Sequence, residues 1–183
     1  DCSALTDVEF AQGITIIPAN LFDGCSGLVN VIIPDTVKYI YECAFQDCTG
    51  LEKVGLPDGL KAISDEVFMG CTSLKEITIP ASVTGFGFRV FKNCSGMEKA
   101  TWNDYSAILD ETFSGCSSLK EFIIPDTVQT IGKDAFYGCK NLQTVSIGKS
   151  VSSIDSFAFG SCEALQEVII PEGTTTIGEY VFS

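Results

Sequence analysis

The chain has 183 residues and no histidine, and its 24 acidic and 11 basic residues give a net charge of −13 at pH 7. Without histidine, a Ser/His catalytic triad, a histidine general base and a histidine-ligated zinc site are all excluded within this chain. The negative charge repels nucleic acid and anionic lipid, so we expect neither as a partner. No segment approaches the roughly 18 consecutive apolar residues that span a bilayer, so we expect no membrane insertion.

Cysteines recur at a nearly constant spacing along the whole chain. Eight of the nine lie 23 residues apart, except for one step of 22, and form a ladder: Cys2, Cys25, Cys48, Cys71, Cys94, Cys116, Cys139 and Cys162. A fixed period in the twenties is typical of a solenoid, in which each repeat contacts only its neighbours. We therefore predict a single solenoid domain over residues 1–183, with about eight 23-residue repeats and one irregular repeat at 94–116.

Each repeat carries, in chain order, a strand, a proline, a short extended segment and a turn. Apolar positions six and eight residues after the cysteine alternate with outward positions five and seven, which predicts a strand buried on one face. Proline ends this strand in five repeats, at Pro34, Pro57, Pro80, Pro125 and Pro171. A Val-x-x-Ile segment follows, and then a small or β-branched residue with Phe just before the next cysteine. We predict a parallel sheet on one face of the solenoid and short strands or 3₁₀ turns on the other.

The cysteine ladder suggests buried free thiols rather than a chemical site. Side chains stacked every ~4.8 Å point in parallel and cannot converge on one zinc ion. Their parallel Cβ vectors are also too far apart for the usual disulfide geometry. A thiol suits a tight position before the strand, where its S–H can reach a backbone carbonyl. We expect no metal and no cofactor, and we expect Cys43, which lies off the ladder, to be the only accessible thiol.

The irregular repeat departs from the pattern at several positions. Ala100 replaces a larger aliphatic residue, Trp102 and Asn103 replace the usual Ile-Pro pair, and one residue is missing. One interpretation makes Trp102 and Tyr105 an aromatic anchor for a partner. The other places Trp102 in a core column, where its bulk compensates for the small Ala100, and its phase favours this second interpretation. Either way, we expect the local geometry of the stack to change here.

The outward positions five and seven residues after each cysteine are the candidate binding face, because repeat proteins commonly bind on the sheet side. They mix small polar residues, both charges and isolated isoleucines, without the aromatic row expected for sugar stacking. The candidate residues are Asn30, Ile32, Lys53, Glu76, Thr78, Lys99, Thr101, Glu121, Ile123, Glu167 and Ile169.

The repeat pattern resembles a known family. Leu119 to Cys139 reads LKEFIIPDTVQTIGKDAFYGC, which looks like the leucine-rich repeat of the BspA type, and the match covers the whole chain. The resemblance implies a right-handed leucine-rich repeat superhelix from a surface or secreted protein of anaerobic bacteria or protozoan parasites. It also implies adhesion to host proteins or to other cells.

From these observations we expect a noncatalytic protein-interaction or adhesion module, located outside the cell or on its surface, with a host matrix or surface protein as its partner. A passive spacer that displays another domain is the alternative, and carbohydrate binding is the third reading. Neither end of the chain carries a polar capping segment. Because solenoids need such caps, we expect a fragment of a longer protein, or end-to-end contact between copies.

Overall fold

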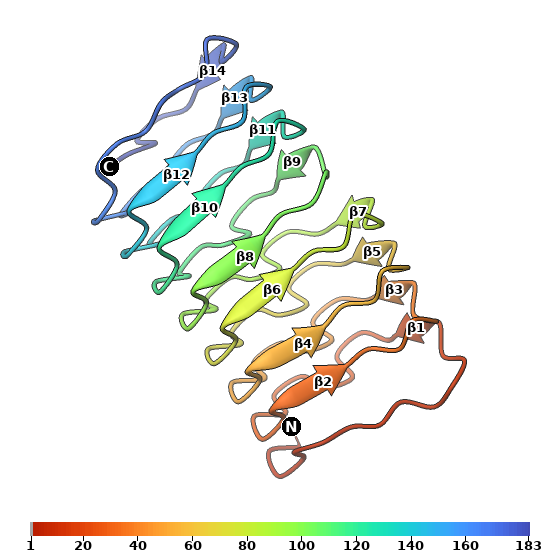
Figure 1. Cartoon of the computed structure of the whole chain (residues 1–183). Coiled ribbons are helices and arrows are strands. Elements are labelled where there is room, and N and C mark those ends of the chain that lie inside the picture. The colour runs from red at the N-terminus through yellow and green to blue at the C-terminus, as the bar shows by residue number, and fades with distance from the viewer. Residues whose placement is uncertain (1) are drawn as a thin grey trace.

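The repeats form successive coils of a parallel β-solenoid in the computed structural model, which describes residues 2–183 (Figure 1). We number the coils by their ladder cysteines, so that coil 1 begins at Cys2, coil 5 at Cys94 and coil 8 at Cys162. No helix occurs among the described residues. The predicted fold class is confirmed, while the handedness of the coil stays a prediction.

One side of the solenoid, here called the strand face, carries three-residue strands. Each has a buried or half-buried central residue between two exposed ones, as the alternating sequence predicts. These strands are β2 (Asn30–Ile32), β4 (Lys53–Gly55), β6 (Glu76–Thr78), β8 (Lys99–Thr101), β10 (Glu121–Ile123) and β12 (Thr144–Ser146). They pair in twos, β2 with β4, β6 with β8 and β10 with β12, rather than in the one continuous sheet that we expected. Coil 8 adds only a single bridge, between Thr144 and Glu167.

The opposite side, here called the back face, carries two-residue strands built from the Val-x-x-Ile segments. They are β1 (Ile16–Ile17), β3 (Tyr39–Ile40), β5 (Ala62–Ile63), β7 (Gly85–Phe86), β9 (Ala107–Ile108), β11 (Thr130–Ile131), β13 (Ser153–Ile154) and β14 (Thr176–Ile177). They form two four-stranded parallel sheets, β1-β3-β5-β7 and β9-β11-β13-β14. The break between the two sheets coincides with the missing residue of coil 5, so the predicted change of local geometry is confirmed.

Turns, rather than the expected 3₁₀ helix, join each back-face strand to the next cysteine. Each turn begins with a residue in a left-handed conformation, with φ between 53° and 59°: Asn20, Cys43, Glu66, Arg89, Glu111, Asp134, Phe157 and Tyr180. In the first seven coils a second residue with positive φ follows four residues later, at Gly24, Asp47, Gly70, Asn93, Gly115, Gly138 and Ser161. A left-handed residue interrupts the run of helical dihedrals that a 3₁₀ helix needs. The turn therefore stays short and brings the following Phe into the core.

Stacked phenylalanines form the centre of the core. Adjacent rings lie 5.1–5.7 Å apart between centroids and 4–20° from parallel, the offset stacking that aromatic pairs favour. The stack is Phe22, Phe45, Phe68, Phe91, Phe113, Phe136, Phe159 and Phe182, one per coil. Leucine and isoleucine columns surround it, and Leu28, Leu51 and Leu119 are fully buried. Side chains thus fill the interior of the solenoid from coil to coil.

Candidate protein-interaction surface

All eleven candidate residues on the strand face are exposed to solvent. Register pairing aligns them in columns, with Asn30 opposite Lys53 and Glu76 opposite Lys99. The isoleucines stand out, because Ile32, Ile123 and Ile169 are 81%, 73% and 75% exposed. These side chains protrude from the strand face and take no part in the core.

Two hollows lie on the strand face, each beside a small residue. One, of about 310 Å³, surrounds Gly55, whose register partner is the exposed Ile32. The other, of about 510 Å³, includes Ser146 and Ile169. Since Ile123 is the register partner of Ser146, two isoleucines stand on either side of this serine. A small residue between large neighbours leaves room for a side chain of another molecule.

Trp102 does not belong to this surface. It is only 6% exposed, and its ring lies against Phe86 and Phe113, at 4.7 and 5.7 Å between centroids. Its indole N–H donates to the backbone oxygen of Tyr105 at 3.4 Å, and Tyr105 is half-buried against Phe86. The interpretation of Trp102 as an anchor for a partner is therefore wrong, because the side chain fills the core space that the small Ala100 leaves.

The ladder thiols from coil 3 to coil 8 are hydrogen-bonded and held in their protonated form. From coil 3 to coil 8, each ladder Sγ donates to the carbonyl oxygen of the core Phe that lies 25 or 26 residues earlier in the chain, as in Cys94 to Phe68. These distances are 3.1–3.2 Å. Burial raises the pKa of Cys48 and Cys162 to about 12 and that of Cys94 well above its usual value. A thiol that stays protonated is neither a nucleophile nor a metal ligand.

The expectation about accessible thiols needs correction. Cys43 is half-buried and donates to a Glu66 oxygen at 3.6 Å, and burial raises its pKa, with the negative charge of Glu66 adding to the effect. Cys162 is also half-buried, and Cys2 is exposed. These two lie in the outermost coils, where no further coil covers them on one side.

An ionic cluster on the turns, which sequence reasoning missed, joins coils 3, 4 and 5. The guanidinium of Arg89 bonds Glu66 at 3.0 Å and Glu111 at 2.9 Å, and Lys92 bonds the other oxygen of Glu111. Burial raises the pKa of Glu111, but hydrogen bonds from Lys92 and Arg89 outweigh it, so the pKa lies below its usual value. The only signal in the sequence is opposite charges recurring at steps of 22 or 23 residues.

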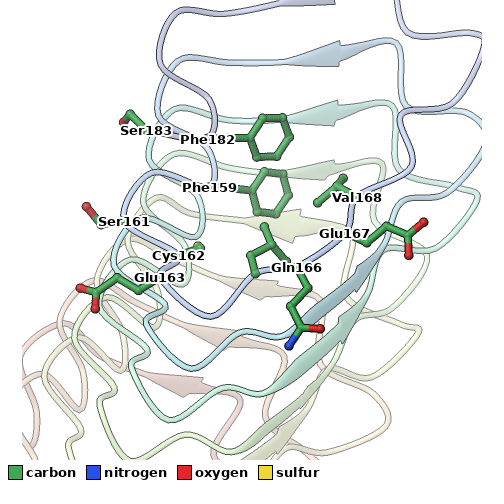
Figure 2. A pocket seen from close by; sticks show the side chains of 10 residues that line it. Phe159, Ser161, Cys162, Glu163, Gln166, Glu167, Val168, Phe182 and Ser183 are labelled. Carbon is green, nitrogen blue, oxygen red and sulfur yellow. The ribbon is translucent and has the colours of Figure 1, made fainter.

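A cavity of about 480 Å³ opens at the C-terminal edge of the stack, beside Phe159, Phe182 and Val168 (Figure 2). The carboxylates of Glu163 and Glu167 point away from it on opposite sides, so they do not face each other as a catalytic pair would (Figure 2). Phe182 is 49% exposed there. End-to-end contact between copies through such an edge stays a prediction.

No group of three or more metal-ligating side chains comes together within residues 2–183. The same part of the chain holds no helix long and apolar enough to cross a membrane. What the geometry offers is an extended surface of exposed columns and shallow hollows on a regular scaffold.

Stacked parallel coils, most of them with a buried leucine two residues before the three-residue strand, define a leucine-rich repeat solenoid. The family model described as BspA type leucine rich repeat region (6 copies) matches residues 1–106 and 97–183. Together these matches span the chain, which therefore belongs to the BspA type leucine-rich repeat family, as the repeat pattern predicts.

Solved structures of bacterial leucine-rich repeat proteins are similar to this chain. A protein from Bacteroides ovatus is 30% identical with a TM-score of 0.73, and the match covers 92% of this chain and 50% of that protein. One from Eubacterium ventriosum is 26% identical with a TM-score of 0.82, covering 93% of this chain and 46% of that one. A leucine rich cell surface protein from Faecalibacterium prausnitzii shares the fold, at 23% identity and a TM-score of 0.61, with 94% and 59% covered. The chain thus spans about half the length of the first two, and the search of curated proteins gave no match.

Proposed function

We propose that this chain is a noncatalytic protein-interaction module of a surface or extracellular protein, and that it binds its partner through the strand face. The observation that carries the proposal is the hollow lined by Ser146 and the protruding Ile169, with the equally exposed Ile123 next to Ser146 in the neighbouring strand. Exposed apolar side chains beside a hollow are what a protein partner can bury. Leucine-rich repeat solenoids are typically noncatalytic scaffolds, which agrees with this reading.

Adhesion to a host matrix or surface protein is the specific form that we propose. The repeat family and the likeness to a cell surface protein of the same fold support the location. Carbohydrate binding is less well supported, because the outward columns of the strand face carry no aromatic ring for sugar stacking.

Binding to a panel of purified host matrix proteins tests the proposal. The double variant Ile123→Ser/Ile169→Ser should weaken capture at least tenfold, since both side chains lose their buried contact. Ile177→Ser is the matched control, because Ile177 is an exposed isoleucine on the back face. If no protein is retained at micromolar concentration, the spacer function replaces adhesion. If both variants capture a protein like the wild type, binding through the strand face is refuted.

A further inference from the structure

The back face is interrupted between β7 and β9. Elsewhere on this face each strand pairs in register with its neighbour, but no Cα atom of β7 lies within 8 Å of one in β9. Figure 1 shows β9 standing farther from β7 than the other neighbours stand from each other. Paired strands are about 4.8 Å apart, so a space of about 9.6 Å would accommodate one additional strand.

Both edges of this opening have unpaired backbone groups. In other coils the residue after the back-face strand donates to the preceding coil, as Gly87 N does to Ile63 O at 2.8 Å and Gly132 N to Ile108 O at 2.7 Å. The equivalent bond from Leu109 N to Phe86 O is absent from the described residues, as is the one from Ala107 N to Thr84 O. Two unpaired strand edges that face each other are a template for a third, extended segment.

Side chains close the floor of the opening. Phe86 and Trp102 lie in edge contact at 4.7 Å between centroids and are both buried. Half-buried Tyr105 packs on Phe86. A segment bound here would therefore rest on aromatic rings at the surface of the solenoid without entering the core.

Just beyond the ends of β7 and β9, Arg89 N donates to Asp110 O at 3.1 Å and joins coils 4 and 5 again, and an acidic hollow of about 370 Å³ lies beside these two residues. Its lining holds four carboxylates and two cationic side chains, and one of these cations, Arg89, already bonds Glu66 and Glu111. The lining residues are Asp65, Phe88, Arg89, Asp110, Glu111, Lys133 and Asp134. This excess of negative charge suits a lysine or arginine side chain.

We propose that the opening between β7 and β9 binds an extended peptide segment, which adds one strand to the back face and places a basic side chain in the acidic hollow. The proposal rests on the interaction function above and gives it a second site with a stated partner chemistry. The shorter length of coil 5 then has a role, because it separates the two sheets and leaves their edges free.

A synthetic six-residue peptide of alternating valine and threonine that ends in two lysines is the probe. Binding is followed by amide chemical shifts and by hydrogen exchange. The bound peptide should slow the exchange of the Ala107 and Leu109 amides at least tenfold. The same peptide ending in two glutamates, or carrying a central proline, should bind at least tenfold more weakly. Equal binding of all three peptides, or no binding at millimolar concentration, would overturn the proposal.

Ala107→Pro removes the N–H that faces the opening and should weaken binding of the lysine peptide at least tenfold. The variant keeps the pairing of β9 with β11, which uses other groups such as Ser106 O, the acceptor from Gln129 N at 2.7 Å. Ile16→Pro is the matched control, since β1 is also an edge strand. Unchanged binding by Ala107→Pro would contradict the proposed strand addition.

A further variant tests the charge of the acidic hollow without changing the backbone groups of the opening. Asp134→Asn should weaken binding of the lysine peptide threefold to tenfold, whereas Glu172→Gln, an exposed carboxylate outside the hollow, should not change it. The Ile123→Ser/Ile169→Ser variant should bind this peptide normally. If the wild-type protein captures no matrix protein but still binds the peptide, adhesion through the strand face fails while the opening remains a peptide site.

Discussion

At the scale of single residues, polar caps bond one coil to the next. Asp110 Oδ1 accepts from Lys133 N at 3.0 Å in the following coil, and Asp65 does the same for Phe88 at 2.8 Å. A glycine before each donor allows this close approach, as at Gly132, whose added Cβ would stand 2.5 Å from Asp110 Oδ1 and 2.7 Å from Asp110 N. The arrangement recurs in every second coil, and in coil 7 Ser156 is the acceptor.

Gly132→Ala should therefore destabilise the fold by about 1–3 kcal/mol, because the new methyl group displaces the Asp110 cap and its backbone. Gly55→Ala is the matched control. Nothing lies within 4 Å of its added Cβ, so it should leave stability unchanged or raise it by about 0.5–1 kcal/mol. Urea unfolding of both variants measures this. Equal losses from the two substitutions would contradict the close-packing argument.

The buried thiols predict a loss of stability at high pH. Burial raises the pKa of Cys48 and Cys162 to about 12 and that of Cys71, Cys94, Cys116 and Cys139 well above the usual 9.0. The folded state therefore holds protons that the unfolded state releases above about pH 9. This stabilisation is complete below pH 9 and is lost as the pH rises toward 12, at up to about 1.4 kcal/mol per pH unit for each thiol.

Urea midpoints between pH 7 and pH 10.5 test this prediction, and they should fall steeply above pH 9. Cys94→Val/Cys116→Val should show a shallower fall, because two titrating groups are gone. Cys2→Val, which replaces an exposed thiol, should follow the wild type. A midpoint independent of pH would show that the thiols do not couple to folding.

At the scale of elements, the irregular coil 5 is held by an asparagine rather than a proline. Asn103 is buried, and its Nδ2 donates to Pro80 O at 2.9 Å and to Val83 O at 3.1 Å in coil 4. Its Oδ1 accepts from Tyr105 N at 2.9 Å. The side chain thus closes the shortened turn and ties it to the preceding coil where the back-face ladder is absent.

Asn103→Ala should cost about 2–4 kcal/mol, since it leaves the Val83 carbonyl and the Tyr105 N–H without their partner, while Pro80 O keeps only its bond from Val83 N at 3.1 Å. Asp104→Ala, at an exposed neighbouring position, should cost less than about 0.5 kcal/mol. Thermal unfolding of the two variants compares these effects. A small loss for Asn103→Ala would mean that water replaces the side chain and that the coil closes without it.

At the scale of the whole molecule, stability depends on contacts between neighbouring coils. The phenylalanine stack passes through every coil, and Phe91 contacts Phe68 and Phe113 on either side at 5.7 and 5.5 Å. Phe182 stacks on one ring of the column, that of Phe159 at 5.7 Å, and is half exposed. Because each coil is stabilised by its neighbours, a defect in the middle weakens both halves, whereas one at an edge affects a single interface.

Phe91→Ala should therefore destabilise the protein by about 3–5 kcal/mol, and Phe182→Ala by less than about 1 kcal/mol. Amide hydrogen exchange should also show the edge coils opening at lower free energy than coils 3 to 6. Similar losses for the two substitutions would contradict the nearest-neighbour description.

Much of the fold could be predicted from the periodicity of the sequence. The spacing of the cysteines, the alternating apolar positions and the Val-x-x-Ile segments predicted the coils, both sets of strands and the core columns, because identical phases stack in a solenoid. The candidate strand-face residues were predicted as outward and are exposed. Their role in binding stays a proposal.

Other features depended on distances between coils that no single repeat contains. The sequence showed that coil 5 is one residue short, but only the tertiary structure separated β7 from β9, buried Trp102 and placed Asn103 against Pro80. Likewise, Arg89 reaches Glu66 and Glu111 because left-handed turns align their side chains across coils. The 23-residue period by itself determined which residues share a column, because equivalent positions of successive repeats stack on one another. The tertiary structure decided where a column is interrupted, because this depends on how the irregular coil 5 packs against the regular coils beside it.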